Sequence, residues 1–224
     1  MTGFFGDATL DGMSDALHAR SGGQEDEIGA WFGRRARAGE LSWDGFDDTS
    51  HAYMADKLVA LERDKAEFCY LTCRALRAKR VVEVGTSHGV STLYLAAAVR
   101  DNGGGLVIGT EYEAEKAKAA RANFAAAGLD GFIELREGDL RQTLRNLEGS
   151  IDFVLIDIWV EMARPALELI APHLRAGAVV CADNTVSAAR AYPPYFAFVN
   201  DPANGLKTMT LPFNGGFEMT VKVG

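Results

Sequence analysis

The sequence has few cysteines and no pattern that would pair them. Its 224 residues include three, Cys69, Cys73 and Cys181, an odd number that does not suggest a disulfide framework. Cys69 and Cys73 lie four residues apart, a spacing that puts two thiols on one helix face rather than in a CxxC metal motif. We interpret all three as small core residues of a protein in a reducing compartment, and we expect a cytoplasmic location.

Long apolar runs and blocks of basic residues are also missing. No window of 18 apolar residues suggests a membrane span, and the N-terminus lacks the basic start and apolar core of a signal peptide. The formal net charge is −8, without a long run of lysine and arginine. Such a chain is poorly suited to the phosphate backbone of a nucleic acid. We therefore expect neither a membrane nor a nucleic acid as partner.

Strand-like and helical segments alternate through most of the chain. The strand-like segments are 80–84, 105–110, 132–137, 151–157 and 177–183, and helical patterns at 90–100, 113–128, 140–148 and 160–175 follow the first four. This alternation predicts an α/β fold with a doubly wound, mostly parallel sheet. Two further strands, 206–211 and 217–223, are separated only by PFNGG and predict a C-terminal antiparallel hairpin, which makes seven strands in all.

The chain before the first strand has a different character. Residues 1–50 are glycine-rich and polar, with helical patches near 11–20 and 27–38, whereas 49–79 has the pattern of two helices leading into the core. We predict an N-terminal helical and irregular extension at 1–50 and one main domain at 51–224.

The loop after the first strand predicts a ligand site. The stretch VVEVGTSHGVSTLYLAAAV, residues 81–99, places Glu83 at the end of an apolar strand and Gly85 and Gly89 in the following loop. Glycines there allow a ligand to approach the backbone, but their GxxxG spacing is not the GxGxxG fingerprint of dinucleotide sites. This disfavours a nicotinamide cofactor and favours a cationic ligand without phosphate near Glu83. The alternative is that Glu83 only caps the loop.

Acids at the ends of the next two strands fit the rest of a nucleoside-like ligand. Glu111 follows the second strand at the distance where an acid accepts both hydroxyls of a ribose, and the neighbouring Tyr112 could lie against an adenine face. Asp139, after the third strand, is placed to read an adenine edge. The alternatives are an acid stabilised by a helix N-terminus for Glu111 and an N-cap for Asp139.

Three oxygen-bearing side chains end the fourth and fifth strands. Asp157 follows the fourth strand, and Asp183 and Asn184 end the fifth. Adjacent parallel strands bring these residues to one edge of the sheet, and two carboxylates with an amide oxygen suit Mg²⁺. The sequence therefore predicts a divalent metal site, with a pair of helix caps as the alternative.

Taken in order, these segments resemble the metal-dependent class I S-adenosylmethionine O-methyltransferases of the catechol and caffeoyl-CoA type. The resemblance covers roughly residues 50–224 and rests on EVGTSHGVSTL, GTEYEAEKAKAARANFAAAGL, REGDL, IDFVLID with VVCADN, and LPFNGGFEMTVKV. It implies an enzyme that methylates a small catechol-like hydroxyl acceptor chelated to Mg²⁺ or another divalent cation. It also implies a homodimer.

The resemblance assigns roles to individual residues. Four would line the methionine end of S-adenosylmethionine: Glu83, Gly85, Ser87 and Ser91. Glu111 would bind the ribose and Asp139 the adenine side. Asp157, Asp183 and Asn184 would hold the metal, and Asp157 would also contact the methionine amine.

One position departs from the family pattern. The family's general-base lysine, three residues after the first metal aspartate, corresponds here to Val160, which cannot take a proton. His51 and His88 are other candidate bases, with surface and loop-structural roles as their alternatives. The catalytic base is therefore left unassigned.

Two other function classes stay open. The chain could bind S-adenosylmethionine with weak or lost catalysis, or it could methylate a non-catechol acceptor such as a nitrogen nucleophile. The aromatic, proline-rich segment 192–196 could form an acceptor wall or a dimer contact, and Trp159 could line the acceptor or pack in the core.

Overall fold

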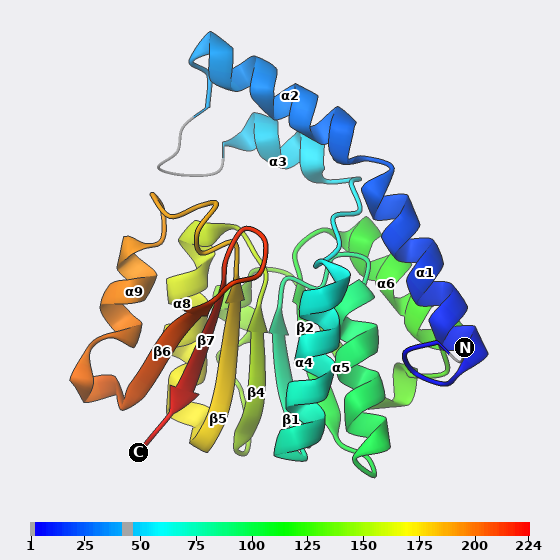
Figure 1. The fold of residues 1–224 in the computed structure, drawn as a ribbon, viewed down its shortest axis with the longest axis vertical. Helices are drawn as coiled ribbons and strands as arrows, with labels where there is room; N and C mark the ends of the chain where they lie inside the picture. Colours follow the sequence, from blue (N-terminus) through cyan, green and yellow to red (C-terminus); the bar gives the residue numbers. More distant parts are fainter. Residues whose placement is uncertain (1–2, 42–46) are drawn as a thin grey trace.

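The computed structural model of the protein describes residues 3–41 and 47–224. Its centre is a seven-stranded sheet with the order β3-β2-β1-β4-β5-β7-β6, in which only β7 runs antiparallel to its two neighbours (Figure 1). The strands are β1 (Arg80–Val84), β2 (Leu106–Glu111), β3 (Ile133–Glu137), β4 (Ile151–Ile156), β5 (Leu174–Asp183), β6 (Leu206–Leu211) and β7 (Phe217–Lys222). The predicted sheet and its C-terminal hairpin are confirmed.

Helices cover both faces of the sheet, as expected when parallel strands are connected by right-handed crossovers. One face carries α4 (Arg63–Leu76), α5 (Val90–Asp101) and α6 (Ala114–Ala126), and the other carries α7 (Leu140–Thr143), α8 (Val160–Ile170) and α9 (Pro193–Val199). Successive residues of β1 divide between the two layers: Val81 belongs to the first core and Val82 to the second. Both faces are therefore apolar, and the polar chemistry is confined to the strand ends.

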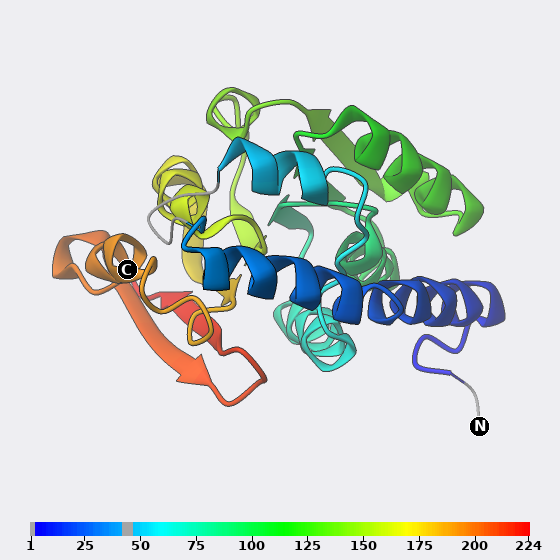
Figure 2. The ribbon, with the colours of Figure 1, turned by 90° about the horizontal axis from the view of Figure 1, so that it is seen from above.

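The N-terminal region is more helical than the sequence predicts. It forms α1 (Ala8–Gly22), α2 (Glu25–Ala38) and α3 (Asp48–Met54), and residues 1–2 and 42–46 of the predicted extension lie outside the described residues. Leu10 and Leu17 of α1 are buried in the core, and the Ser14 and Tyr94 hydroxyls are 2.7 Å apart. Figures 1 and 2 show α2 and α3 above the carboxyl ends of the parallel strands.

Two predicted helices are shorter than the pattern suggested. Residues 140–148 were expected to be helical, but α7 ends at Thr143. The Arg136 guanidinium donates to the carbonyls of Thr143 (2.7 Å) and Asn146 (3.3 Å), so these groups have partners without a longer helix. The α8 helix ends at Ile170, and Pro172 lies in the short 3₁₀ helix Ala171–His173, where it has no N–H to donate.

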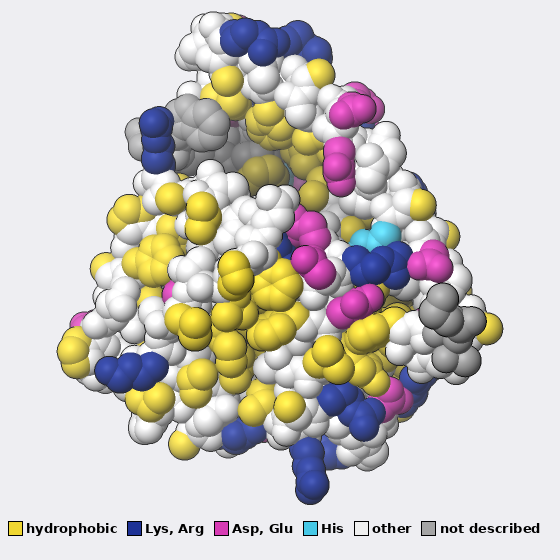
Figure 3. Space-filling model, viewed as in Figure 1, with side chains coloured by type: hydrophobic (Ala, Val, Ile, Leu, Met, Phe, Trp, Pro, Cys, Tyr) yellow, Lys and Arg dark blue, Asp and Glu magenta, His cyan; other side chains and the backbone are white. Residues whose placement is uncertain are grey.

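The remaining described surface contains short turns and one apolar area. The other 3₁₀ turns are Asp130–Phe132 and Pro202–Asn204. Figure 3 shows apolar side chains gathered over α4 and the β6–β7 hairpin, where Leu71 and Met209 are exposed. Within the described ranges, no helix combines the length and the hydropathy needed to cross a bilayer.

Candidate functional site

The loop between β1 and α5 is held close to its neighbours at both glycines. Gly85 has φ +94°, and a Cβ on it would lie 2.0 Å from the carbonyl oxygen of Asp157. Gly89 has φ +83°, and a Cβ there would lie 2.3 Å from the Phe124 ring. Because L-residues avoid this backbone region and no space exists for a side chain, both positions require glycine. The sequence analysis expects these glycines to let a ligand approach the backbone, but in the structure it is Asp157 and Phe124 that come close to them.

Glu83 is fully buried below this loop. Its carboxylate accepts hydrogen bonds from the hydroxyls of Thr86 (2.9 Å), Ser91 (2.6 Å) and Thr92. Burial raises the pKa of Glu83, and these three donors oppose the rise. The predicted contact of Glu83 with a methionine end stays a prediction, because its oxygens already serve as the anchor of the loop.

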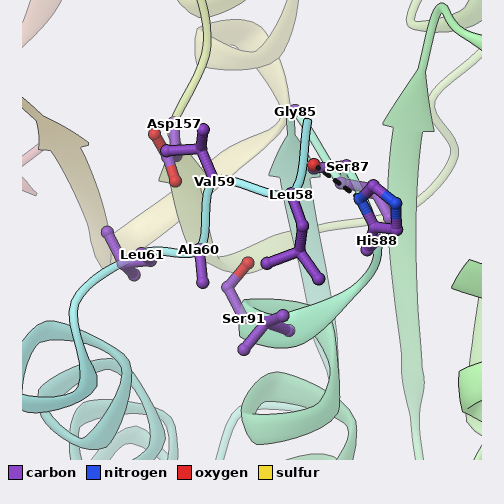
Figure 4. A pocket seen from close by; sticks show the side chains of 11 residues that line it. Leu58, Val59, Ala60, Leu61, Gly85, Ser87, His88, Ser91 and Asp157 are labelled. Atoms are coloured by element: carbon purple, nitrogen blue, oxygen red, sulfur yellow. Dashed lines mark hydrogen bonds between the residues drawn. The ribbon is translucent and has the colours of Figure 1, made fainter. Parts of the chain in front are cut away.

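A cavity lies between the loop and an extended segment, residues 55–62, which we call the strap. It is lined on one side by Leu58 to Leu61 of the strap and on the other by residues 85–88, Val90 and Ser91 of the loop and helix, with Asp157 at one end. Figure 4 shows the strap running alongside the loop, with Asp157 and Ser91 on opposite sides of the space. The predicted residues Gly85, Ser87, Ser91 and Asp157 therefore meet at one cavity.

The strap is fixed from outside by the N-terminal helices. The Gln24 amide donates to the carbonyl of Leu58 (3.0 Å) and accepts from its N–H (3.3 Å). The Ser21 hydroxyl accepts from the N–H of Ala60 (3.0 Å). Leu58 and Leu61 are nearly fully buried, whereas Val59 is exposed. The sequence reasoning missed this side of the cavity, since a short polar-flanked segment between two helices carries no ligand motif.

Glu111 stands at the end of β2, next to the loop. One carboxylate oxygen accepts from the N–H of Ser87 (2.7 Å) and the other from the N–H of Glu113 (2.8 Å). Tyr112 is 66% exposed, and the His51 ring of α3 lies 5.7 Å from its ring, edge-on. His51 also approaches the Glu113 carboxylate at 3.1 Å. An acid fixed by backbone donors beside an exposed aromatic ring is an arrangement that can accept ribose hydroxyls.

Asp139 has a local structural role. Its side chain caps α7 by accepting from the N–H of Arg141 (2.8 Å), and it forms an ion pair with the Arg141 guanidinium (2.6 Å). The Arg141 hydrogen bond lowers the pKa of Asp139. The N-cap alternative is therefore present in the structure, and a contact with adenine stays a prediction.

Asp157, Asp183 and Asn184 come to one edge of the sheet, as predicted, but a lysine joins them. Lys65, in the first turn of α4, has a fully buried side chain. Its ammonium lies 2.5 Å from one oxygen of Asp183 and 2.8 Å from the Glu62 carboxylate. The second Asp183 oxygen accepts from the amide nitrogen of Asn184 (3.0 Å).

This donor set does not fit a divalent cation. The amide of Asn184 turns its nitrogen toward Asp183 and its oxygen toward the Ser187 hydroxyl, 3.1 Å away. A metal ligand would present the amide oxygen instead. Nowhere in residues 3–41 or 47–224 do three His, Cys, Asp or Glu side chains form a group able to hold a metal ion. The predicted magnesium site is therefore not supported by the geometry, because Lys65 already compensates Asp183.

Electrostatics at this edge follow from burial. Desolvation, followed by the charges of Asp183 and Glu83, raises the pKa of Asp157 well above its usual range. Burial alone would lower the pKa of Lys65, but hydrogen bonds to Asp183 and Glu62 outweigh it and raise the pKa. Lys65 is therefore a permanent positive charge at neutral pH.

Of the two predicted candidates for a base, His88 lines the cavity, whereas His51 lies at the Glu113 carboxylate and is not among the lining residues. Val160 is the first residue of α8 and offers no proton acceptor. Burial, then the charges of Arg20 and Lys116, lowers the pKa of His88 to about 4. Such an imidazole is neutral at pH 7 but holds an abstracted proton weakly. Trp159 is 37% exposed and is therefore not fully packed in the core, and its place beside the acceptor stays a prediction.

The aromatic segment after Asn184 was interpreted wrongly for two of its residues. Tyr192 and Tyr195 are each 1% exposed and lie 5.5 Å apart in a T-shaped pair within the core. The Tyr192 hydroxyl donates to the carbonyl of Asp183. These two rings form neither an acceptor wall nor a dimer surface. They belong to the apolar core that covers one face of β5. The three cysteines are free and buried, as the sequence predicts.

Comparisons with known proteins point to methyltransferases. Residues 82–185 match a family model described as a methyltransferase domain. A catechol O-methyltransferase of Mycobacterium tuberculosis (strain ATCC 25618 / H37Rv) is 33% identical over 129 residues, which are 57% of this chain and 58% of that protein. The chain thus spans less than two thirds of the length of that curated relative.

Solved structures share the fold over a longer range. The cofactor-bound crystal structure of Rv0187 from MTB has a TM-score of 0.69 and 26% identity, and the match covers 78% of this chain and 87% of that one. An O-methyltransferase from Bacillus cereus, solved in complex with SAH, has a TM-score of 0.68 and 23% identity over 78% and 87% of the two chains. The second likeness shows the fold alone.

Proposed function

We propose that the chain is a class I S-adenosylmethionine-dependent O-methyltransferase and that it transfers the methyl group of S-adenosylmethionine to a hydroxyl of a small, catechol-like acceptor; its likeness to a methyltransferase domain and to a catechol O-methyltransferase supports this. The observation that carries the proposal is the meeting of Gly85, Ser91 and Asp157 at one cavity, with Glu111 fixed beside it. These groups come from four different segments, and they match the polar ends of one cofactor.

We assign the methionine end and sulfonium of the cofactor to this cavity. Its volume of about 10 Å³ holds no more than a single water, so the strap must move outward to admit them. The Ser91 hydroxyl and the Asp157 carboxyl offer polar contacts, while Leu58 and Leu61 exclude water on the other side. Glu111 would accept the ribose hydroxyls, and the exposed Tyr112 ring would lie against adenine. In the transfer, a lone pair of the acceptor oxygen forms a bond to the methyl carbon, and the carbon–sulfur bond breaks to leave a neutral thioether. The chain's contribution is to align these atoms and to exclude water.

Neither Val160 nor His88 is a strong base for the acceptor's proton. Val160 takes no proton, and a His88 imidazole with a pKa of about 4 is too weak. Acceptors whose hydroxyl is already acidic, such as catechols with electron-withdrawing substituents, are therefore the best substrates under this proposal. The divalent cation of the sequence-based prediction fits the donors poorly, and no step here depends on it. The homodimer, the domain boundary at residue 50 and the cytoplasmic location stay predictions.

The test begins with cofactor binding. Isothermal titration of S-adenosylmethionine should give one site per chain, and Glu111→Gln should weaken it about 100-fold through loss of charge-assisted hydrogen bonds. Glu115→Gln is the matched control, because Glu115 lies four residues later, in the first turn of α6, with its side chain 86% exposed. Binding must then be followed by formation of S-adenosylhomocysteine and a methylated catechol, detected by mass spectrometry. No binding by the parent chain would refute the proposal.

A second candidate function is cofactor binding without efficient transfer, and Val160 favours it. The variant Val160→Lys restores the side chain of the related enzymes at the start of α8. If it methylates a catechol while the parent chain binds the cofactor but stays silent, the binding function is correct. Clear activity of the parent removes this candidate.

A further inference from the structure

Lys65 is a fully buried charged side chain that does not line the cavity. It is contributed by α4, whereas its partner Asp183 ends β5, 118 residues later in the chain. The ammonium lies 5.9 Å above the ring of Phe217, which is itself fully buried in β7. Three elements therefore enclose this one positive charge at the carboxyl edge of the sheet.

The surroundings of Lys65 are built for an ammonium. Two carboxylates, from Glu62 and Asp183, lie within 3 Å of the nitrogen. The second carboxylate oxygen of Asp183 accepts a hydrogen bond from the amide nitrogen of Asn184. The amide oxygen of Asn184 in turn accepts one from the Ser187 hydroxyl. A buried ammonium without such partners would be very costly, so these contacts hold Lys65 in place.

A divalent ion at Asp183 would compete with this arrangement. Two cations at one carboxylate oxygen repel each other, and the lysine would have to leave. The Lys65 ammonium would then have Glu62 as its one remaining carboxylate partner, and the Glu62 side chain is 45% exposed. The divalent ion would also require the Asn184 amide to turn over and give up its bonds to Asp183 and Ser187.

We propose that Lys65 is the resident cation of this edge: its ammonium takes the place beside Asp183 that the sequence predicts for a divalent ion, and the chain works without a metal. The second half of this statement rests on the proposed function, while the first half does not. Lys65 then acts as a positioning residue, because it fixes the Asp183 carboxylate and the β5 end at which the acceptor would be held.

The experiment measures metal binding without turnover. The full-length chain is stripped with chelator and titrated with Mn²⁺, with free Mn²⁺ followed by electron paramagnetic resonance. We expect no saturable site in the parent below about 1 mM, and at least about tenfold tighter binding in Lys65→Met, which frees Asp183. Lys118→Met, at an exposed position on α6, is the control and should resemble the parent.

The outcomes are separable from the fate of the proposed function. A stoichiometric Mn²⁺ site of micromolar affinity in the parent, lost in Asp183→Asn, would overturn the inference even if Lys65→Met does not fold. If the parent binds no Mn²⁺ and also fails to bind S-adenosylmethionine, the resident cation stands and the methyltransferase proposal falls. Where turnover is found, it should change less than about twofold between excess chelator and added Mg²⁺. A strict Mg²⁺ requirement would refute the metal-free part.

Discussion

At the β1 end of the sheet's carboxyl edge, the buried acid is surrounded by hydroxyls from its own loop and helix; at the β5 end, it is paired with a lysine from another part of the chain. Glu83 takes its donors from Thr86, Ser91 and Thr92, all within nine residues. Asp183 takes its cation from Lys65, 118 residues away. Neutral donors leave the charge of the carboxylate uncompensated, whereas an ammonium compensates it. The two halves of one edge thus differ in how the charge of the buried acid is balanced.

The largest effect is expected where the two halves touch. Gly85→Ala places a Cβ 2.0 Å from the Asp157 carbonyl at φ +94°, and should destabilise the fold by about 3–5 kcal/mol. Gly104→Ala has almost the same φ, +95°, but open space around the Cβ, and should cost about 1 kcal/mol. Urea unfolding of both variants measures the difference. Equal losses would mean that backbone strain, not the contact between the halves, makes Gly85 necessary.

Neutralising each acid in turn should show how much each of the two environments contributes to the stability of the fold. Asp183→Asn leaves the Lys65 ammonium with Glu62 alone and should cost about 3 kcal/mol. Glu83→Gln removes a charge that burial already disfavours, as its raised pKa indicates, and should cost about 1–2 kcal/mol. Chemical denaturation at pH 7 gives both values. The reverse order would show that the hydroxyl cluster is the more demanding environment.

The loop half should also carry a pH dependence. His88 has a folded-state pKa of about 4 against 6.5 when unfolded, so the unfolded chain binds more protons as pH falls. Its contribution is complete above pH 6.5 and is lost between 6.5 and about 4, amounting to about 2 kcal/mol between pH 7 and pH 5. His88→Gln should flatten the stability profile by that amount. An unchanged profile would assign the acid sensitivity of the fold to other groups.

The smallest effect concerns Asp139, at the far end of the loop half. Asp139→Ala removes the α7 cap and should cost about 1 kcal/mol, whereas Arg141→Ala removes only an exposed ion pair and should cost at most about 0.5 kcal/mol. Cofactor titration of both variants then sharpens the role of Asp139. Affinity lost in the first variant but retained in the second would support a contact with adenine.

The same contrast explains what could be predicted from the sequence. The seven strands and the hairpin follow from hydrophobic alternation, and Glu111 follows from its place after a strand, because these signals are local. Lys65 lies in an ordinary amphipathic helix, and nothing near it indicates a partner at the far end of the chain. The prediction for Tyr192 and Tyr195 was wrong for a related reason, because a cluster of aromatic residues has the same sequence pattern whether it faces a ligand or the core.

The strap has a kinetic consequence. Its backbone is bonded to Gln24 and Ser21 on one side, and its leucines close the cavity on the other. If the cofactor binds beneath the strap as proposed, its release requires these hydrogen bonds to open, and its residence time is then set by a local opening step that involves the N-terminal helices. Loosening Gln24 should therefore accelerate exchange of product for fresh cofactor without changing any group that touches the sulfonium. The N-terminal helices would then help to set the rate at which the spent cofactor is released.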